Sequence, residues 1–281
     1  MRQFNRQKKG FTLIELLVVI AVIALLLSVV MPALRSAKNH ARTVVCSTRL
    51  RQIFLATTLY HMDNDYKRFT LRMSAETDAR YWMVPLAPYI GDELGVPGNV
   101  AEVMPLIICP SSPMGNFVPD SALEVGPGWF GRFDRPFRYG KGSNPIYGSY
   151  TCNTWWTLDD RDQTRRNMSV NSPESFPDWN RLGSDVPLFG DGVWPEGPPR
   201  NTDKQFKPTL AELRGGAHRG VYTGGLGESS PGLWRFAVDR HNMRINVLFK
   251  DGTVKPVHLE RFYDVRWANN WVRESQDLVY K

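Results

Sequence analysis

The sequence predicts an α+β fold, in which a long N-terminal hydrophobic helix packs on an antiparallel β-sheet domain with long loops. Residues 11–31 form a predominantly apolar run, and residues 33–62 contain neither glycine nor proline. Most of the 23 glycines and 20 prolines follow residue 85, which favours a loop-rich domain over a helical bundle. Near the C-terminus, Asp251-Gly252 separates two strand-like runs, and this pattern is a strong signal for a β-hairpin.

The apolar run 11–31 is long enough to span a bilayer as a helix. Four basic residues precede it without any acidic residue: Arg2, Arg6, Lys8 and Lys9. This asymmetry predicts a cytoplasmic N-terminus and an exported remainder. A cleaved secretory signal peptide fits less well, because its apolar core is shorter and residues 33–37 offer only a poor cleavage site.

Glu15 is the ionisable residue of this run, and a plain membrane anchor does not explain it. A charge inside a spanning helix costs roughly 2.5–3.5 kcal/mol, so it usually has a function or a partner. Glu15 lies five residues after Gly10. Cleavage after Gly10 would give Phe11 a free α-amino group one helical turn away. The two charges would neutralise each other, and between neighbouring subunits the same pairing would set their axial stagger.

The segment Lys8-Lys9-Gly10-Phe11-Thr12-Leu13-Ile14-Glu15 resembles the type IV prepilin cleavage and methylation motif almost letter for letter. Resemblance to type IV pilins and type II secretion pseudopilins implies that a prepilin peptidase cleaves between Gly10 and Phe11 and methylates the new amine. It also implies that Glu15 serves filament assembly with other pilin or pseudopilin subunits.

The resulting domain organisation has four parts. We expect residues 1–10 to form a cytoplasmic leader and residues 11–32 to form a transmembrane helix that becomes the filament core. Residues 33–62 continue the helix onto the globular domain, and residues 63–281 form the exported domain with its C-terminal hairpin. The protein would lie in the inner membrane as a single-pass protein with its N-terminus in the cytoplasm. The exported domain would lie in the periplasm, or on the cell surface after assembly.

One face of the predicted helix changes character along its length. Arg35, Lys38, Arg42 and Arg49 share a face at 100° per residue. Farther along nearly the same face, the residues become mostly apolar: Cys46, Leu50, Ile53, Thr57 and Tyr60. We therefore expect the helix to begin packing on its own domain near residue 46. A solvated basic patch near lipid headgroups is compatible with this interpretation.

Charge and cysteine content exclude some classes of protein. Removing residues 1–10 lowers the formal net charge from +7 by four, to +3, and no basic stripe predicts a nucleic-acid partner. The three cysteines form no CxxC pair, so a zinc site built on such pairs is unsupported. We expect any disulfide to join Cys46 and Cys109, with Cys109–Cys152 as the alternative.

The C-terminal part carries a second resemblance. His241, followed after nine residues by Asp251-Gly252, is similar to the His-x9-Asp-Gly signature of a large group of bacterial pilin-like proteins. Other points of that group match at Cys46 with Leu50-Arg51-Gln52, at Cys109-Pro110, and at Ser149-Tyr150 with Asn153. The chain departs from the group at Thr253, where the group usually has histidine, and this weakens a metal site that needs that ligand.

The exported domain shows no catalytic motif, so we expect no enzyme and no cofactor. His241, Asp251 and Gly252 are expected to be structural, with His241 at the far end of the hairpin from its turn and without a metal. Asp191-Gly192 is interpreted as a turn. Asp159, Asp160 and Asp162 are interpreted as a solvated loop, with calcium binding as the alternative.

Several segments are expected to be strands or loops. Strands are predicted at residues 106–109, 146–158, 186–189, 234–238, 244–249 and 253–257, and long loops at 113–145 and 195–232. Residues 81–86 form either a short helix or a strand. Five tryptophans stand outside these core elements or within their ends, and burial under loops is favoured over a sugar-binding surface: Trp129, Trp155, Trp156, Trp179 and Trp194.

Two functions follow from these resemblances. The first is a structural subunit of a type IV pilus-like or type II secretion pseudopilus filament, processed by prepilin peptidase and held in inner-membrane lipid before assembly. The second is a pilin-anchored minor subunit whose exported domain binds sugars, cell-wall polymers or secreted cargo.

Overall fold

A computed structural model describes residues 12–68, 82–90, 104–113, 124–125, 128–129, 131–139, 146–157, 172–205, 213 and 232–273. The chain divides into two compact units, residues 1–41 and residues 42–281. The predicted leader, residues 1–10, and the acidic cluster at residues 159–162 lie outside the described residues.

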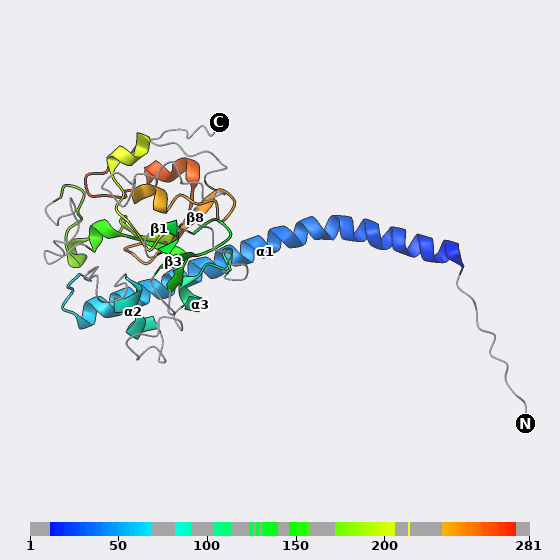
Figure 1. The fold of residues 1–281 in the computed structure, drawn as a ribbon, viewed down its shortest axis with the longest axis horizontal. Helices are drawn as coiled ribbons and strands as arrows, with labels where there is room; N and C mark the ends of the chain where they lie inside the picture. The colour runs from blue at the N-terminus through cyan, green and yellow to red at the C-terminus, as the bar shows by residue number, and fades with distance from the viewer. Residues whose placement is uncertain are drawn as a thin grey trace, which may run out of the picture. The chain divides into compact units, whose positions relative to one another are not determined.

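Helix α1 spans Leu13–Asp63 and continues through Pro32 without a break (Figure 1). This agrees with the helix predicted from the apolar run and from the segment free of glycine and proline. Within the first unit every described residue, from Thr12 to Ala41, is exposed. This part of α1 is long and apolar enough to cross a membrane.

The part of α1 in the second unit is packed into a core. Cys46, Leu50, Ile53 and Ala56 are buried among the aromatic and aliphatic side chains of the unit. Their spacing of three or four residues places them on one helical face. Packing therefore starts near residue 46, as predicted.

A five-stranded sheet forms the centre of the second unit, in the order β7-β5-β6-β8-β9. Its strands are β5 (Tyr150–Asn153), β6 (Pro187–Asp191), β7 (Glu196–Gly197), β8 (Arg244–Phe249) and β9 (Val254–His258). All neighbours are antiparallel except β5 and β7, which are parallel. The prediction of an antiparallel sheet is thus confirmed for β5, β6, β8 and β9, and β7 adds a parallel strand at one edge.

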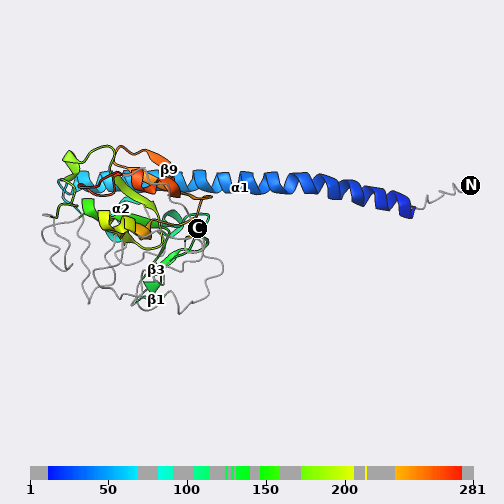
Figure 2. The same cartoon turned by 90° about the horizontal axis from the view of Figure 1, so that it is seen from above.

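The predicted C-terminal hairpin is confirmed by the pairing of β8 with β9. Gly252 in its turn has a φ of +80°, a conformation that glycine adopts without the steric cost of a side chain. A Cβ atom at this position would lie 2.8 Å from the ring of Phe54 in α1. The turn therefore rests against α1, and Figure 2 shows β9 beside that helix.

A second, four-stranded sheet has the order β1-β2-β3-β4 and is antiparallel throughout. Its strands are β1 (Glu124–Val125), β2 (Gly128–Trp129), β3 (Phe137–Tyr139) and β4 (Ile146–Gly148). The first three strands lie in the region predicted to be a long loop. They are only two or three residues long, too short to produce an alternating pattern in the sequence.

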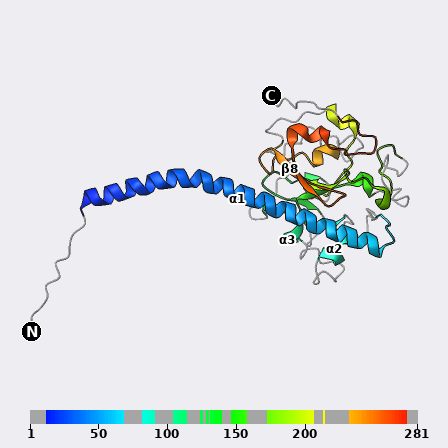
Figure 3. The ribbon, with the colours of Figure 1, turned by 180° about the vertical axis from the view of Figure 1, so that it is seen from behind.

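Two short helices, α2 (Met83–Ile90) and α3 (Met104–Ile107), lie beside the part of α1 that belongs to the second unit (Figures 1 and 3). Tyr89 of α2 packs edge-on against Tyr60, with ring centroids 5.9 Å apart. The Arg49 guanidinium of α1 donates a hydrogen bond to the Ile108 carbonyl, just after α3. This basic residue thus ties two elements together.

The remaining short elements are 3₁₀ helices: η4 (Thr154–Trp156), η5 (Trp179–Arg181), η6 (Asn201–Gln205), η7 (Gly232–Arg235) and η8 (Leu259–Asp264). Two predicted strands are wrong: residues 106–109 cover the end of α3 and the two residues after it, and residues 234–238 cover the end of η7 and the three residues after it. Both are short continuous apolar runs, which periodicity cannot assign to helix or strand. Pro105 lies in the first turn of α3, where a helix tolerates proline.

Candidate functional site

The first turn of α1 is closed by a reciprocal contact between Thr12 and Glu15. The Thr12 backbone N–H donates to Glu15 Oε2 at 2.8 Å, and the Thr12 hydroxyl donates to the same oxygen at 2.9 Å. The Glu15 N–H in turn donates to Thr12 Oγ1 at 3.3 Å. This is a capping box, in which the two residues satisfy amide groups that the helix itself cannot.

The capping box shows what sequence reasoning missed at Glu15. The pattern Thr-x-x-Glu at residues 12–15 is a signature of a helix start and was available in the sequence. Glu15 therefore has a structural partner within its own chain. Gly10 and Phe11, the predicted cleavage site, lie outside the described residues, so the pairing of Glu15 with the Phe11 amine stays a prediction.

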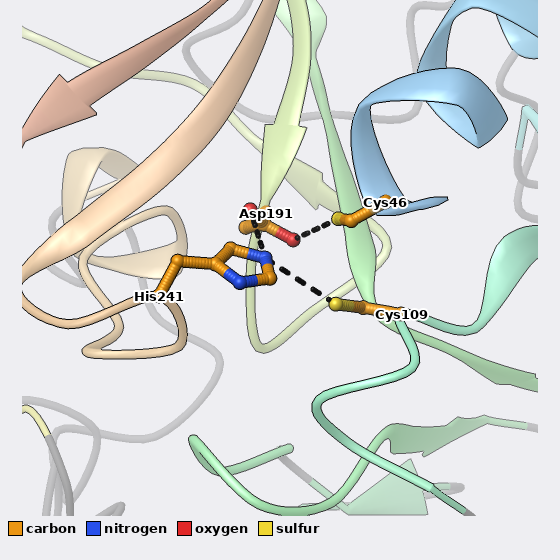
Figure 4. A group of neighbouring side chains, drawn as sticks. All are labelled: Cys46, Cys109, Asp191 and His241. Carbon is orange, nitrogen blue, oxygen red and sulfur yellow. Dashed lines mark hydrogen bonds and ion pairs between the residues drawn. The ribbon is translucent and has the colours of Figure 1, made fainter. Parts of the chain in front are cut away.

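Four side chains from distant segments meet in the core of the second unit (Figure 4). Cys46 comes from α1, and Cys109 lies just after α3. Asp191 is the last residue of β6, and His241 precedes β8. All four residues are buried, and one ligand atom from each lies within 4.8 Å of the others. We call these residues the Cys-Cys-Asp-His cluster.

Three contacts define the geometry of the Cys-Cys-Asp-His cluster (Figure 4). The Cys46 thiol donates a hydrogen bond to Asp191 Oδ1 at 3.2 Å. His241 Nε2 lies 3.3 Å from Asp191 Oδ2 and 3.4 Å from Cys109 Sγ. One ring nitrogen thus faces both a carboxylate and a sulfur.

The other ring nitrogen of His241 faces hydroxyl groups. Its Nδ1 lies 3.2 Å from Thr43 Oγ1 in α1 and 3.4 Å from Ser111 Oγ. These contacts fix the plane of the imidazole and keep Nε2 directed at the cluster.

Asp191 is held from both sides by donors outside the cluster. The Asn246 backbone N–H donates to Asp191 Oδ2 at 2.7 Å. The Arg240 guanidinium, also fully buried, lies 3.7 Å from Asp191 Oδ1. Arg240 is itself fixed by hydrogen bonds to the carbonyl oxygens of Ser149, Gly192 and Arg132. The position of the Asp191 carboxylate is therefore fixed, and the Arg240 guanidinium compensates its negative charge.

The side chains of the cluster shift one another's pKa values. Burial favours the neutral Cys109 thiol, but the hydrogen bonds from Cys46 and His241 outweigh it and lower the pKa of Cys109 to about 6. Burial also disfavours a charged imidazole, yet Asp191 and Cys109 raise the pKa of His241 to about 10. Burial, together with Cys109 and Asp191, raises the pKa of Cys46. The pKa of Asp191 is lowered, because His241 and Arg240 outweigh its burial.

The cluster brings together three of the residues selected from the sequence: Cys46, Cys109 and His241. No disulfide joins the three cysteines, although the sulfur atoms of Cys46 and Cys109 lie within 4.8 Å of each other. The two sulfur atoms are therefore near each other, as the predicted pairing requires, and the disulfide itself stays a prediction. The turn residues Asp251 and Gly252 are not part of the cluster.

Asp191 corrects one interpretation of the sequence. It was interpreted as a turn residue, but it ends a buried strand and contacts both Cys46 and His241. Asp251 does form a turn, since its Oδ1 accepts hydrogen bonds from the Thr253 N–H at 2.9 Å and the Thr253 hydroxyl at 2.6 Å. The two Asp-Gly pairs thus have different roles, which their local sequence does not distinguish.

The tryptophans do not form an exposed binding surface among the described residues. Trp155, Trp156, Trp179 and Trp194 are all buried, at 5% exposure or less. The side chain of Trp129 and the acidic residues Asp159, Asp160 and Asp162 lie outside the described side chains. Burial under loops, the interpretation favoured from the sequence, is confirmed for these four tryptophans.

Comparisons with known proteins match the N-terminal segment. Residues 5–31 match the family model of the prokaryotic N-terminal methylation motif. Over 60 residues, 21% of this chain, the sequence is 43% identical to the type IV wide pilus major component PilA4 of Thermus thermophilus. Over 60 residues it is also 36% identical to type II secretion system core protein G of Pseudomonas aeruginosa.

These matches cover 46% and 42% of the two relatives, so the chain spans less than half the length of the curated relatives that it matches. No solved structure matches the chain significantly. The chain therefore carries the prokaryotic N-terminal methylation motif, and its first segment is similar to that of type IV pilins and type II secretion pseudopilins.

Proposed function

We propose that this chain is a structural subunit of a type IV pilus-like or type II secretion pseudopilus filament. The observation that carries the proposal is the methylation motif at residues 5–31, in which Glu15 is followed by an exposed apolar helix. The similarity to PilA4 and to core protein G supports the same function.

The exposed part of α1 explains why such a subunit needs partners. Its large apolar side chains have no cover within the unit, and examples are Leu13 at 77%, Leu25 at 68% and Val29 at 71% exposure. An apolar surface of this extent marks a membrane or protein contact. In the proposed function, inner-membrane lipid covers these side chains before assembly, and the helices of other subunits cover them afterwards.

Glu15 then supplies the register of assembly. Within the chain it caps α1 through Thr12. In the filament its carboxylate would pair with the methylated amine of Phe11 in a neighbour. The exported residues would lie in the periplasm or on the cell surface, without catalytic activity of their own. The alternative, a minor subunit that binds sugars through tryptophans, loses support because four of these side chains are buried.

Intact-mass measurement of the native protein tests the proposed processing. We expect the mature chain to begin at Phe11 and to carry one methyl group. A Gly10→Leu variant is the matched control and should keep the leader, because the peptidase would lose its cleavage site. A mature start near residue 34 or 38 would contradict the proposal and indicate an ordinary signal peptide.

Imaging tests filament formation independently of processing. Sheared surface material, examined by electron microscopy and by mass spectrometry of its subunits, should contain filaments that include this chain. Correct processing without incorporation into any filament would reject the structural-subunit function while retaining the prepilin-like N-terminus.

A further inference from the structure

We propose that the Cys-Cys-Asp-His cluster is a structural binding site for one borderline-soft divalent metal ion, of the class of Zn²⁺. The four residues come from four separate segments, and their ligand atoms gather within 4.8 Å of one another (Figure 4). This inference is independent of filament assembly, and it assigns Cys46, Cys109, Asp191 and His241 a role that the sequence did not predict for them.

The shortest separations of the ligand atoms are close to those around a tetrahedral ion. With metal–ligand bonds of about 2.0–2.3 Å, tetrahedral ligands lie roughly 3.3–3.8 Å apart. In the structure, Cys46 Sγ lies 3.2 Å from Asp191 Oδ1, and Cys109 Sγ lies 3.4 Å from His241 Nε2. All four ligand atoms lie within 4.8 Å of one another, so small side-chain movements suffice to close the site.

The types of ligand select the metal. Two thiolates, one imidazole and one carboxylate are a nitrogen, sulfur and oxygen set that suits Zn²⁺ better than Ca²⁺ or Mg²⁺, which prefer oxygen ligands alone. Four protein ligands leave no open position, which is typical of structural rather than catalytic zinc. The cluster is also buried, with Cys46, Cys109 and Asp191 at 0% exposure and His241 at 8%.

The surroundings supply the support that a metal site needs. A histidine ligand usually bonds through its second ring nitrogen to a group that fixes its orientation. Here Thr43 and Ser111 occupy that place on Nδ1 of His241. Asp191 keeps the Asn246 N–H on its Oδ2, and the Tyr150 hydroxyl donates to Cys46 Sγ at 3.3 Å.

Charge also balances in the filled site. Two thiolates and one carboxylate carry three negative charges, and a divalent ion leaves one of them uncompensated. The buried Arg240 guanidinium, 3.7 Å from Asp191 Oδ1, supplies the remaining positive charge. Burial of an ionic group is tolerated when its charges are paired in this way.

The site would fasten α1 to the sheet. One ion would connect Cys46 of α1 to Asp191 of β6. It would also connect both to Cys109, just after α3, and to His241, just before β8. Because the ligands are buried, the ion would enter as the unit folds, and its binding would stabilise the folded unit.

The experiment uses the full-length protein, purified in detergent from cells grown with zinc and then dialysed against metal-free buffer. Elemental analysis by mass spectrometry should find about one zinc per chain in the wild type. The Cys109→Ser variant should lose most of it. The matched control is Cys152→Ser, which changes another buried cysteine outside the cluster and should keep the ion.

A second measurement covers the case in which Cys109→Ser does not fold. Cobalt exchanged into the wild type should give thiolate-to-cobalt charge-transfer bands and the visible spectrum of a tetrahedral ion. Zinc that remains in a folded Cys109→Ser variant would place the ion elsewhere and overturn the proposal. Folded wild type that holds no metal, with Cys46 and Cys109 either as free thiols or in a disulfide found by non-reducing peptide mapping, would overturn it as well.

Discussion

The two parts of helix α1, before and after residue 41, are stabilised in different ways. They belong to one helix, and residues 33–62 contain no glycine or proline. From Thr12 to Ala41 every side chain is exposed, including large leucines and valines. From Arg42 onward the helix buries one face, with Cys46, Leu50 and Ile53 at 0% exposure. The first part therefore needs partners from outside the chain, whereas the second part finds its partners within it.

The largest effect that distinguishes the two parts is expected at Glu15. Glu15→Val should abolish filament formation while leaving the amount of protein in the membrane unchanged. Removal of an intramembrane charge makes insertion easier, so any loss must lie in assembly. Filaments are quantified in the sheared fraction, and membrane protein is quantified by immunoblot.

Thr12→Ala is the matched control, because it removes both contacts of the Thr12 hydroxyl in the capping box and keeps the Glu15 carboxylate. It should weaken the helix start by about 1 kcal/mol and preserve assembly. If Thr12→Ala stops assembly as completely as Glu15→Val, capping rather than pairing with the Phe11 amine is the role of Glu15.

The second comparison places the same substitution in each part of α1. Leu50→Ala should lower the free energy of unfolding of the second unit by about 3 kcal/mol, because it leaves a cavity in the core. Leu25→Ala, at a position 68% exposed, should leave that free energy unchanged. Denaturant unfolding in detergent, followed by the fluorescence of the buried tryptophans, measures both. Equal effects would contradict the division of α1.

The smallest expected effect is a dependence on pH near the end of α1. His61 is buried and stacks on Trp179, with ring centroids 4.1 Å apart, and Lys250 lies over the same tryptophan. Burial, with a smaller contribution from Lys250 and Arg68, lowers the pKa of His61 from 6.5 to about 4. The folded unit therefore favours the neutral imidazole. Between pH 6.5 and about pH 4, His61 is protonated in the unfolded chain but neutral in the folded unit.

The contribution of the neutral His61 side chain to stability is complete above pH 6.5 and is lost as the pH falls towards 4. Between about pH 7.5 and about pH 5, the wild type should lose about 2 kcal/mol more than His61→Phe. Denaturant unfolding at both pH values measures this difference, and the variant corrects for other groups that titrate there. An equal loss in both proteins would show that His61 does not titrate in this range.

The sequence predicted the features that depend on neighbouring residues. The extent of α1, the start of its packing near Cys46 and the hairpin at Asp251-Gly252 follow from periodicity and turn chemistry. The short strands β1 to β3 and the helix α3 did not follow, because runs of two to four residues carry no period. The capping box at Thr12 was available as a local pattern and was missed.

The Cys-Cys-Asp-His cluster was only partly predictable. Cys46, Cys109 and His241 were selected individually, but Asp191 looked like the turn residue Asp251. The fold distinguishes the two aspartates. Asp191 ends β6, a strand inside the sheet next to β8, whereas Asp251 lies in the turn between β8 and β9. Contacts over 132 and 145 residues of sequence, such as Cys109 with His241 and Cys46 with Asp191, have no signature in a single chain.

The continuity of α1 also has a mechanical consequence. Tension on the first part of the helix passes along an unbroken backbone into residues that form the core of the second unit, including Leu50 and Ile53. Residues 33–62 contain no glycine or proline that would act as a compliant joint. A pulling force on a subunit therefore cannot be relieved by extending a flexible tether. The force would instead be transmitted through the helix to the core residues of the second unit.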